Sequence, residues 1–77
     1  MEQFGTILKE LRTEKNLSQK ALSKATEITQ SSIARWELNK TEPQSSEIRK
    51  LALFFSVSAD YLLGLEDETG KKIYEKY

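Results

Sequence analysis

The sequence predicts an all-α domain of five helices, and three observations lead to this prediction. Apolar residues recur at spacings of three and four in successive segments, which is the period of an amphipathic helix. Ser or Thr stands directly before three of these segments, where a helix N-cap belongs. No stretch of four or more residues alternates as a strand would, and 77 residues are enough for one domain with one modest core.

The first helix is predicted by four apolar residues at positions i, i+3, i+4 and i+7, namely Phe4, Ile7, Leu8 and Leu11. It is expected to end near Asn16, because asparagine tolerates the left-handed conformation of a helix stop.

The second and third helices follow in quick succession. Ser18 is the expected N-cap of a helix over residues 19–26, and Thr29 is the expected N-cap of the next. In the third helix Ile33 and Trp36 lie three apart, so Trp36 is assigned to the core rather than to a stacking surface. Asn39 is the expected stop.

A loop and two further helices complete the domain. Residues 40–44 carry the only proline, Pro43, and read as a loop. The fourth helix has apolar residues at helical spacing: Ile48, Leu51, Ala52 and Phe55. Ser58 is expected to cap a short fifth helix containing Tyr61, Leu62 and Leu63, which Gly64 closes.

The last twelve residues differ in composition from the rest. Residues 1–65 are assigned to the helical domain and residues 66–77 to an acidic linker and short tail. Ile73 and Tyr77 lie four apart, and the pairs 68/72 and 71/75 combine opposite charges at helical spacing, which favours a short helix. An exposed, disordered tail is the alternative.

Composition excludes several classes of function. The chain has no cysteine and no histidine, so it lacks thiolate metal ligands and the commonest general base. No signal peptide and no membrane-length apolar stretch is visible, so a cytoplasmic protein without cofactor or small-molecule ligand is expected. The zero net charge counts against nucleic-acid binding, but residues 15–50 hold seven Lys/Arg against four Asp/Glu.

The short connection between the second and third helices is the most informative feature. About three residues, 27–29, separate them, so the two helices must cross steeply as in a helix-turn-helix. The first turn of the third helix then points outward. Its polar side chains Gln30 and Ser31, with Arg35 one turn further along the same face, are suited to read base edges in a major groove.

The chain resembles a known family. The segments "LKELRTEKNLSQKAL", "ITQSSIARWELNKTEP" and "LALFFSVSADYLLG", with the spacing between them, are similar to the lambda-repressor-like (Xre/Cro-type) DNA-binding domains over residues 4–64. The resemblance implies a five-helix bundle that binds double-stranded DNA as a homodimer, with the third helix in the major groove.

The resemblance also implies roles for individual residues. Gln30, Ser31 and Arg35 match positions that contact bases. Arg12 and Glu37 match a structural pair that links the first helix to the third.

A second group of residues is expected to contact the DNA backbone. Gln19 matches a glutamine that braces the DNA backbone and the third helix, while Asn39, Lys40 and Thr41 match the loop after that helix, which commonly touches phosphate. Ser18 and Thr29 join this group because helix N-termini attract anions.

Four positions depart from the family pattern. Glu27 stands where glycine is usual, Ser23 where alanine is favoured, and Leu53 where a polar residue is usual. Ser31 is shorter than the large polar residue often found there, which weakens the expectation of a direct base contact.

Together these observations predict a sequence-specific transcriptional regulator, a repressor, acting on a two-fold operator. A dimer contact is expected from Leu53, Val57, Tyr61, Ile73 or Tyr77. The alternatives are a protein-interaction module of antitoxin or antirepressor type, and the DNA-binding fragment of a longer repressor.

Overall fold

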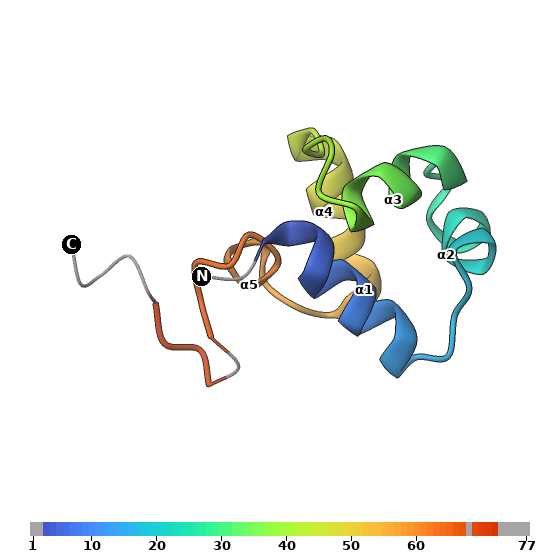
Figure 1. The fold of residues 1–77 in the computed structure, drawn as a ribbon. Coiled ribbons are helices and arrows are strands. Elements are labelled where there is room, and N and C mark those ends of the chain that lie inside the picture. Colours follow the sequence, from blue (N-terminus) through green and yellow to red (C-terminus); the bar gives the residue numbers. More distant parts are fainter. Residues whose placement is uncertain (1–2, 68, 73–77) are drawn as a thin grey trace.

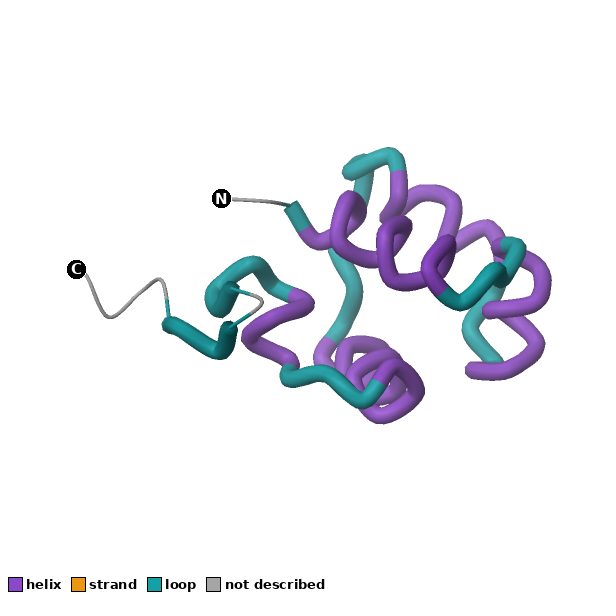
Figure 2. Tube along the Cα trace, turned by 90° about the horizontal axis from the view of Figure 1, so that it is seen from below, coloured by secondary structure: helices purple, strands orange, loops and turns teal. Residues whose placement is uncertain are grey.

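Five helices account for most of the chain, as predicted. The computed structural model describes residues 3–67 and 69–72, and its helices follow the order shown in Figure 1. They are α1 (Phe4–Glu14), α2 (Gln19–Thr26), α3 (Gln30–Glu37), α4 (Ser45–Phe55) and α5 (Ala59–Leu62). In Figure 1, α2 and α3 lie at one end of the molecule, and α5 lies at the other. Outside the residues drawn in grey, the tube in Figure 2 is helix and loop, and α4 is seen end-on there.

The three predicted N-caps are confirmed. The hydroxyl of Ser18 accepts a hydrogen bond from the Ala21 amide at 3.0 Å, and that of Ser58 accepts one from the Tyr61 amide at 3.0 Å. Thr29 caps α3 in the same way. Each cap satisfies an amide that has no partner inside its helix, and such a bond stabilises by about 1 kcal/mol.

The helix stops are set by residues in the left-handed conformation. Asn16 and Asn39, the two predicted stops, both have φ of 56°. Glu27 at the end of α2 has φ of 61°, at the position where the resembled family usually has glycine. A residue with a β-carbon is strained in this left-handed conformation by about 1 kcal/mol. Ser56 after α4 also has φ of 56°, which was not predicted.

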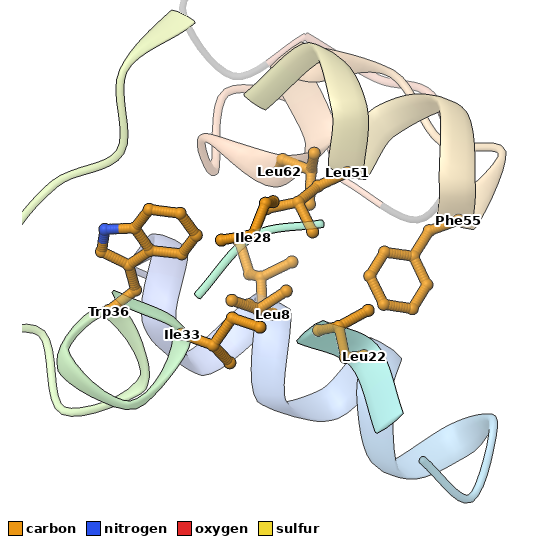
Figure 3. Packing of buried hydrophobic residues seen from close by; sticks show 9 residues of the cluster. Leu8, Leu22, Ile28, Ile33, Trp36, Leu51, Phe55 and Leu62 are labelled. Atoms are coloured by element: carbon orange, nitrogen blue, oxygen red, sulfur yellow. The ribbon is translucent and has the colours of Figure 1, made fainter. Parts of the chain in front are cut away.

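One core joins all five helices. Its fully buried side chains come one from each helix: Leu8, Leu22, Ile33, Leu51 and Leu62. Burial of a side chain of this size stabilises the fold by about 1.5–3 kcal/mol. Figure 3 shows these residues pointing into one shared space, with α4 and α5 closing it from above.

Trp36 lies in this core with 3% of its surface exposed, which confirms its assignment. The ring of Phe4 meets it edge-on, with ring centroids 5.8 Å apart. Close by, α1 and the end of α3 approach so tightly that only glycine fits at Gly5, because a β-carbon there would overlap the Trp36 carbonyl. The Gly5 amide donates to Oδ1 of Asn39 at 3.2 Å, so the stop of α3 also caps α1.

On α4, two neighbouring apolar residues point in different directions. Phe54 is half-buried, packs against the core and meets Phe55 edge-on, with centroids 5.0 Å apart. Leu53 is 73% exposed. Val57 and Tyr61, two of the candidates for a dimer contact, are half-buried against the core.

The start of the tail takes neither predicted form. Residues 66–67 and 69–72 make a tight turn closed by an antiparallel bridge between Glu66 and Lys72, so the predicted helix is wrong for this part. Nζ of Lys72 donates to Asp60 at 3.0 Å and also to Glu66, and these bonds hold the turn against α5. Opposite charges at helical spacing contribute only a few tenths of a kcal/mol, which does not compete with these contacts. Ile73 and Tyr77 lie outside the described residues.

Candidate nucleic-acid interface

The two faces of α3 differ sharply. Ile33 and Trp36 are 0% and 3% exposed and fasten one face to the core. Ser31 and Arg35 are exposed on the opposite face, and their spacing of four residues places them one above the other. Gln30 is exposed at the start of the helix. It precedes Arg35 by five residues, a rotation of about 140° around the helix axis, so Arg35 lies directly in line with Ser31 and to one side of Gln30.

The first turn of α3 presents both hydroxyls and amides. The Thr29 hydroxyl accepts from the Ser32 amide at 3.3 Å and donates to the Ser32 hydroxyl at 2.8 Å. It also lies 3.5 Å from Oγ of Ser31. Within the described part of the chain, the amides of Gln30 and Ser31 have no partner. Two outward amides at a helix start are suited to an anionic ligand such as a phosphate.

The start of α2 is tied to the end of α3. Ser18 uses its hydroxyl as the cap of α2 and is exposed. Gln19 is half-buried, and its Nε2 donates to Oε1 of Glu37 at 3.0 Å. The structure thus brings the glutamine expected to brace α3 into contact with that helix.

Arg12 and Glu37 form a two-pronged ion pair between α1 and α3. Nε of Arg12 donates to Oε2 of Glu37 at 2.7 Å, and Nη2 donates to Oε1 at 2.8 Å. Nη1 donates to the carbonyl of Leu17 at 2.7 Å, so the same guanidinium also holds the chain that leads into α2. The side chains are only 12% and 4% exposed, which makes this a buried pair.

The charge of this pair is maintained by its own hydrogen bonds. Burial raises the pKa of the Glu37 carboxyl. The hydrogen bonds from Arg12 and Gln19 and the charges of Arg12 and Lys9 lower it by more, so the pKa of Glu37 lies below its usual value. The bond to Glu37 raises the pKa of Arg12 against the opposing effect of burial. Both groups are therefore ionised at neutral pH.

The loop after α3 offers a cation and a hydroxyl. Lys40 and Thr41 are exposed, and their side chains make no hydrogen bond or ion pair with any described residue. The Lys40 amide donates to the carbonyl of Arg35 at 3.0 Å, which fixes the loop against the end of the helix. Asn39, which matches the same loop, uses its side chain to cap α1 instead.

Two hydroxyls of α2 that bond to the turn between α2 and α3 were not predicted as part of the site. Ser23 donates to the carbonyl of Ile28, and Thr26 accepts from the amide of Ile28 at 3.4 Å. Ser23 differs from the family pattern, and that departure was the signal in the sequence. The partner of its hydroxyl depends on the turn's three-dimensional path, which the pattern does not give.

Neither a metal site nor a membrane-spanning helix is found in the described residues. Residues 3–67 and 69–72 contain no group of three or more His, Cys, Asp or Glu side chains placed to hold a metal ion. No helix in the same ranges is both long and apolar enough to cross a bilayer.

Comparison with known proteins gives a consistent picture. The family model described as "Helix-turn-helix" matches residues 8–62. The chain is 35% identical over 65 residues, 84% of its length, to the HTH-type transcriptional activator BcrR of Enterococcus faecalis. It is 37% identical over 60 residues, 78% of its length, to the SPbeta prophage-derived uncharacterized HTH-type transcriptional regulator YonR of Bacillus subtilis (strain 168). It is 34% identical over 69 residues, 90% of its length, to the HTH-type transcriptional regulator ImmR of the same organism. The matches cover 32%, 56% and 54% of these relatives, respectively, so the chain spans only part of their length.

Proposed function

Because the chain belongs to the helix-turn-helix family of DNA-binding transcriptional regulators, we propose that it binds double-stranded DNA with α3 in the major groove. The observation that carries this proposal is the polar outer face of α3, set against an inner face that is fixed in the core. Any surface helix has a polar outer face, but this one belongs to the second helix of a helix-turn-helix and is held rigidly by the core, as base readout requires.

Each exposed side chain of α3 has a defined task in this proposal. Arg35 reads guanine, because its two donor groups match O6 and N7 in the major groove. Gln30 contacts a base near the N-terminal end of the helix, since its amide both donates and accepts. Ser31 is short, so it contacts a base only where the helix lies deep in the groove.

Contacts with the DNA backbone hold the helix in register. The unpaired amides lie at the start of α3 and the exposed Lys40 and Thr41 follow its end, and we assign both groups to phosphates that flank the groove. Ser18, Gln19 and Thr29 complete the contacts at the N-termini of α2 and α3. The hydrogen bond from Gln19 to Glu37 also fixes the start of α2 relative to the end of α3.

We further propose that the protein is a cytoplasmic repressor that acts as a homodimer on a two-fold operator, without a cofactor. One chain supplies one reading helix, so recognition of two half-sites about one DNA turn apart requires two chains. Leu53, 73% exposed on α4, supports a contact between copies, and the half-buried Val57 and Tyr61, which line a separate hollow with Leu11, are further candidates for it. Residues 1–65 are proposed as the DNA-binding unit, with the remainder as linker and tail.

A protein-interaction module of antitoxin or antirepressor type is the second candidate. The exposed Leu53 and the net charge of zero favour it, because a strong DNA binder usually carries excess positive charge. It predicts weak DNA binding without sequence preference.

The test is selection of bound sites from random double-stranded DNA at a stated salt concentration. The proposal predicts an enriched, two-fold symmetric site with a fixed half-site spacing. Recovery of sequences no different from the input pool would refute DNA reading and favour the second candidate.

A further inference from the structure

The turn between α2 and α3 contains a strained backbone conformation at a residue that is not glycine. Glu27 adopts the left-handed conformation, with φ of 61° and ψ of 21°, although it has a β-carbon. Only three residues join the two helices, so a small rotation in this turn changes the direction in which α3 leaves it. Something other than the backbone preference of Glu27 must hold the turn in place.

Two hydroxyls of α2 do this by binding both backbone groups of Ile28. The amide of Ile28 donates to Oγ1 of Thr26 at 3.4 Å, and its carbonyl accepts from Oγ of Ser23. Thr26 is 8% exposed, and its own hydroxyl proton goes to the Leu22 carbonyl at 2.8 Å. The side chain of Ile28 is 4% exposed in the core, so water has little access to replace these bonds.

The arrangement is a clamp on one peptide residue. The Ile28 side chain fixes the position of the turn, and the two hydroxyls fix the rotation of the peptide groups on either side of it. The next residue, Thr29, is the N-cap of α3, so that rotation is passed directly to the start of the helix.

We propose that Ser23 and Thr26 are positioning residues that set the angle of α3, and with it the sequence specificity of DNA binding. This inference rests on the proposed function, because it assigns a part of the DNA-reading apparatus. Neither side chain needs to touch DNA. Their loss lets α3 tilt, so that its side chains no longer meet base edges in register, while contacts to phosphate tolerate the change.

The test compares three variants. Ser23→Ala and Thr26→Val each remove one bond to Ile28 with little change of volume. Thr26→Val also removes the bond to the Leu22 carbonyl, so its control must lose a bond of that second kind alone. Thr13→Val is the control, because the hydroxyl of Thr13 also donates to the carbonyl four residues earlier, at 2.9 Å, but Thr13 lies on α1 and its side chain makes no bond to the turn between α2 and α3. The measured quantity is the ratio of affinities for the selected site and for random DNA.

The proposal predicts that Ser23→Ala and Thr26→Val each lower this ratio about tenfold, the effect of one lost buried hydrogen bond. Affinity for random DNA and the dependence of binding on salt stay unchanged, and Thr13→Val stays within twofold of wild type. A ratio within twofold of wild type for Ser23→Ala overturns the positioning role. If the wild-type protein itself binds all DNA alike, the proposed function fails instead.

A substitution of Glu27, combined with Ser23→Ala, distinguishes an effect of Ser23 on the angle of α3 from an effect on the stability of the domain. Glu27→Gly removes the left-handed strain but leaves both hydroxyls in place. Added to Ser23→Ala, it is expected to restore the thermal midpoint while the specificity ratio stays low. Recovery of the ratio together with the midpoint would show that Ser23 acts only through stability, and would overturn the proposal.

Discussion

Replacement of Glu37 by alanine is predicted to be among the most damaging changes at a polar position. The substitution leaves Arg12 largely buried, with its bond to the Leu17 carbonyl but without the two bonds to the carboxylate. Gln19 loses its acceptor as well. Breaking one side of a buried ion pair costs about 3–5 kcal/mol, because an uncompensated charge remains.

That cost is large against a domain stability of about 5–15 kcal/mol. With a urea dependence of about 2 kcal/mol per M, the unfolding midpoint should fall by about 2 M. The assay is equilibrium urea denaturation followed by Trp36 fluorescence. Replacing both partners with apolar residues, Arg12→Met with Glu37→Leu, should recover most of the loss, because it removes the orphaned charge. A midpoint for Glu37→Ala that moves by less than about 0.5 M would refute the reasoning, since that is the behaviour of an exposed pair.

The same pair gives a pH dependence with a definite sign. The pKa of Glu37 is lower in the folded than in the unfolded chain, so the unfolded chain takes up the proton more readily. Its contribution to stability is therefore fully present above the ordinary carboxyl pKa of about 4.3, and it is lost as the pH falls through the lower pKa of the folded state. Glu37→Gln should remove this part of the acid-dependent loss of stability. An unchanged acid profile in that variant would show that other carboxyls account for it.

Three further predictions concern the phosphate contacts, the dimer and the packing of α1. Lys40→Ala should weaken binding to specific and random DNA alike and reduce the salt slope by about one per subunit; an unchanged slope in a salt titration would contradict the phosphate contact. Leu53→Ser, or deletion of residues 66–77, should reduce cooperative filling of a two-fold site without changing half-site affinity, and independent binding with no spacing preference would rule out the dimer. Gly5→Ala should destabilise the domain by about 1–3 kcal/mol, because the new β-carbon would overlap the Trp36 carbonyl and lie 2.6 Å from Oδ1 of Asn39. A rise in its thermal midpoint, as helix propensity alone predicts, would show that α1 can shift without cost.

Features encoded over a few neighbouring residues could be predicted from the sequence. The caps Ser18, Thr29 and Ser58 and the stops Asn16 and Asn39 act within one helical turn, so composition and spacing locate them. The assignment of Trp36 to the core needed only its spacing from Ile33.

Features that depend on distant partners could not be predicted. The sequence places Asn39 at a helix end, but not its amide oxygen on Gly5, 34 residues away. The turn after Glu66 is held against α5 by the contact of Lys72 with Asp60, which outweighs a weak helical charge pattern. In the candidate site, the exposed face of α3 follows from periodicity, whereas the bond from Ser23 to Ile28 depends on the path of the turn.

Replacement of Arg35 tests whether α3 reads bases through its exposed face. The measurement is the affinity of wild type and Arg35→Ala for the selected site and for every single-base variant of one half-site, at one salt concentration. Arg35→Ala is expected to cost about 1–3 kcal/mol on the selected site and to abolish discrimination at one base pair per half-site, leaving the other positions as they were. Equal weakening on every sequence, with discrimination intact at all positions, would show that Arg35 contacts only phosphate and would contradict the reading face assigned to α3.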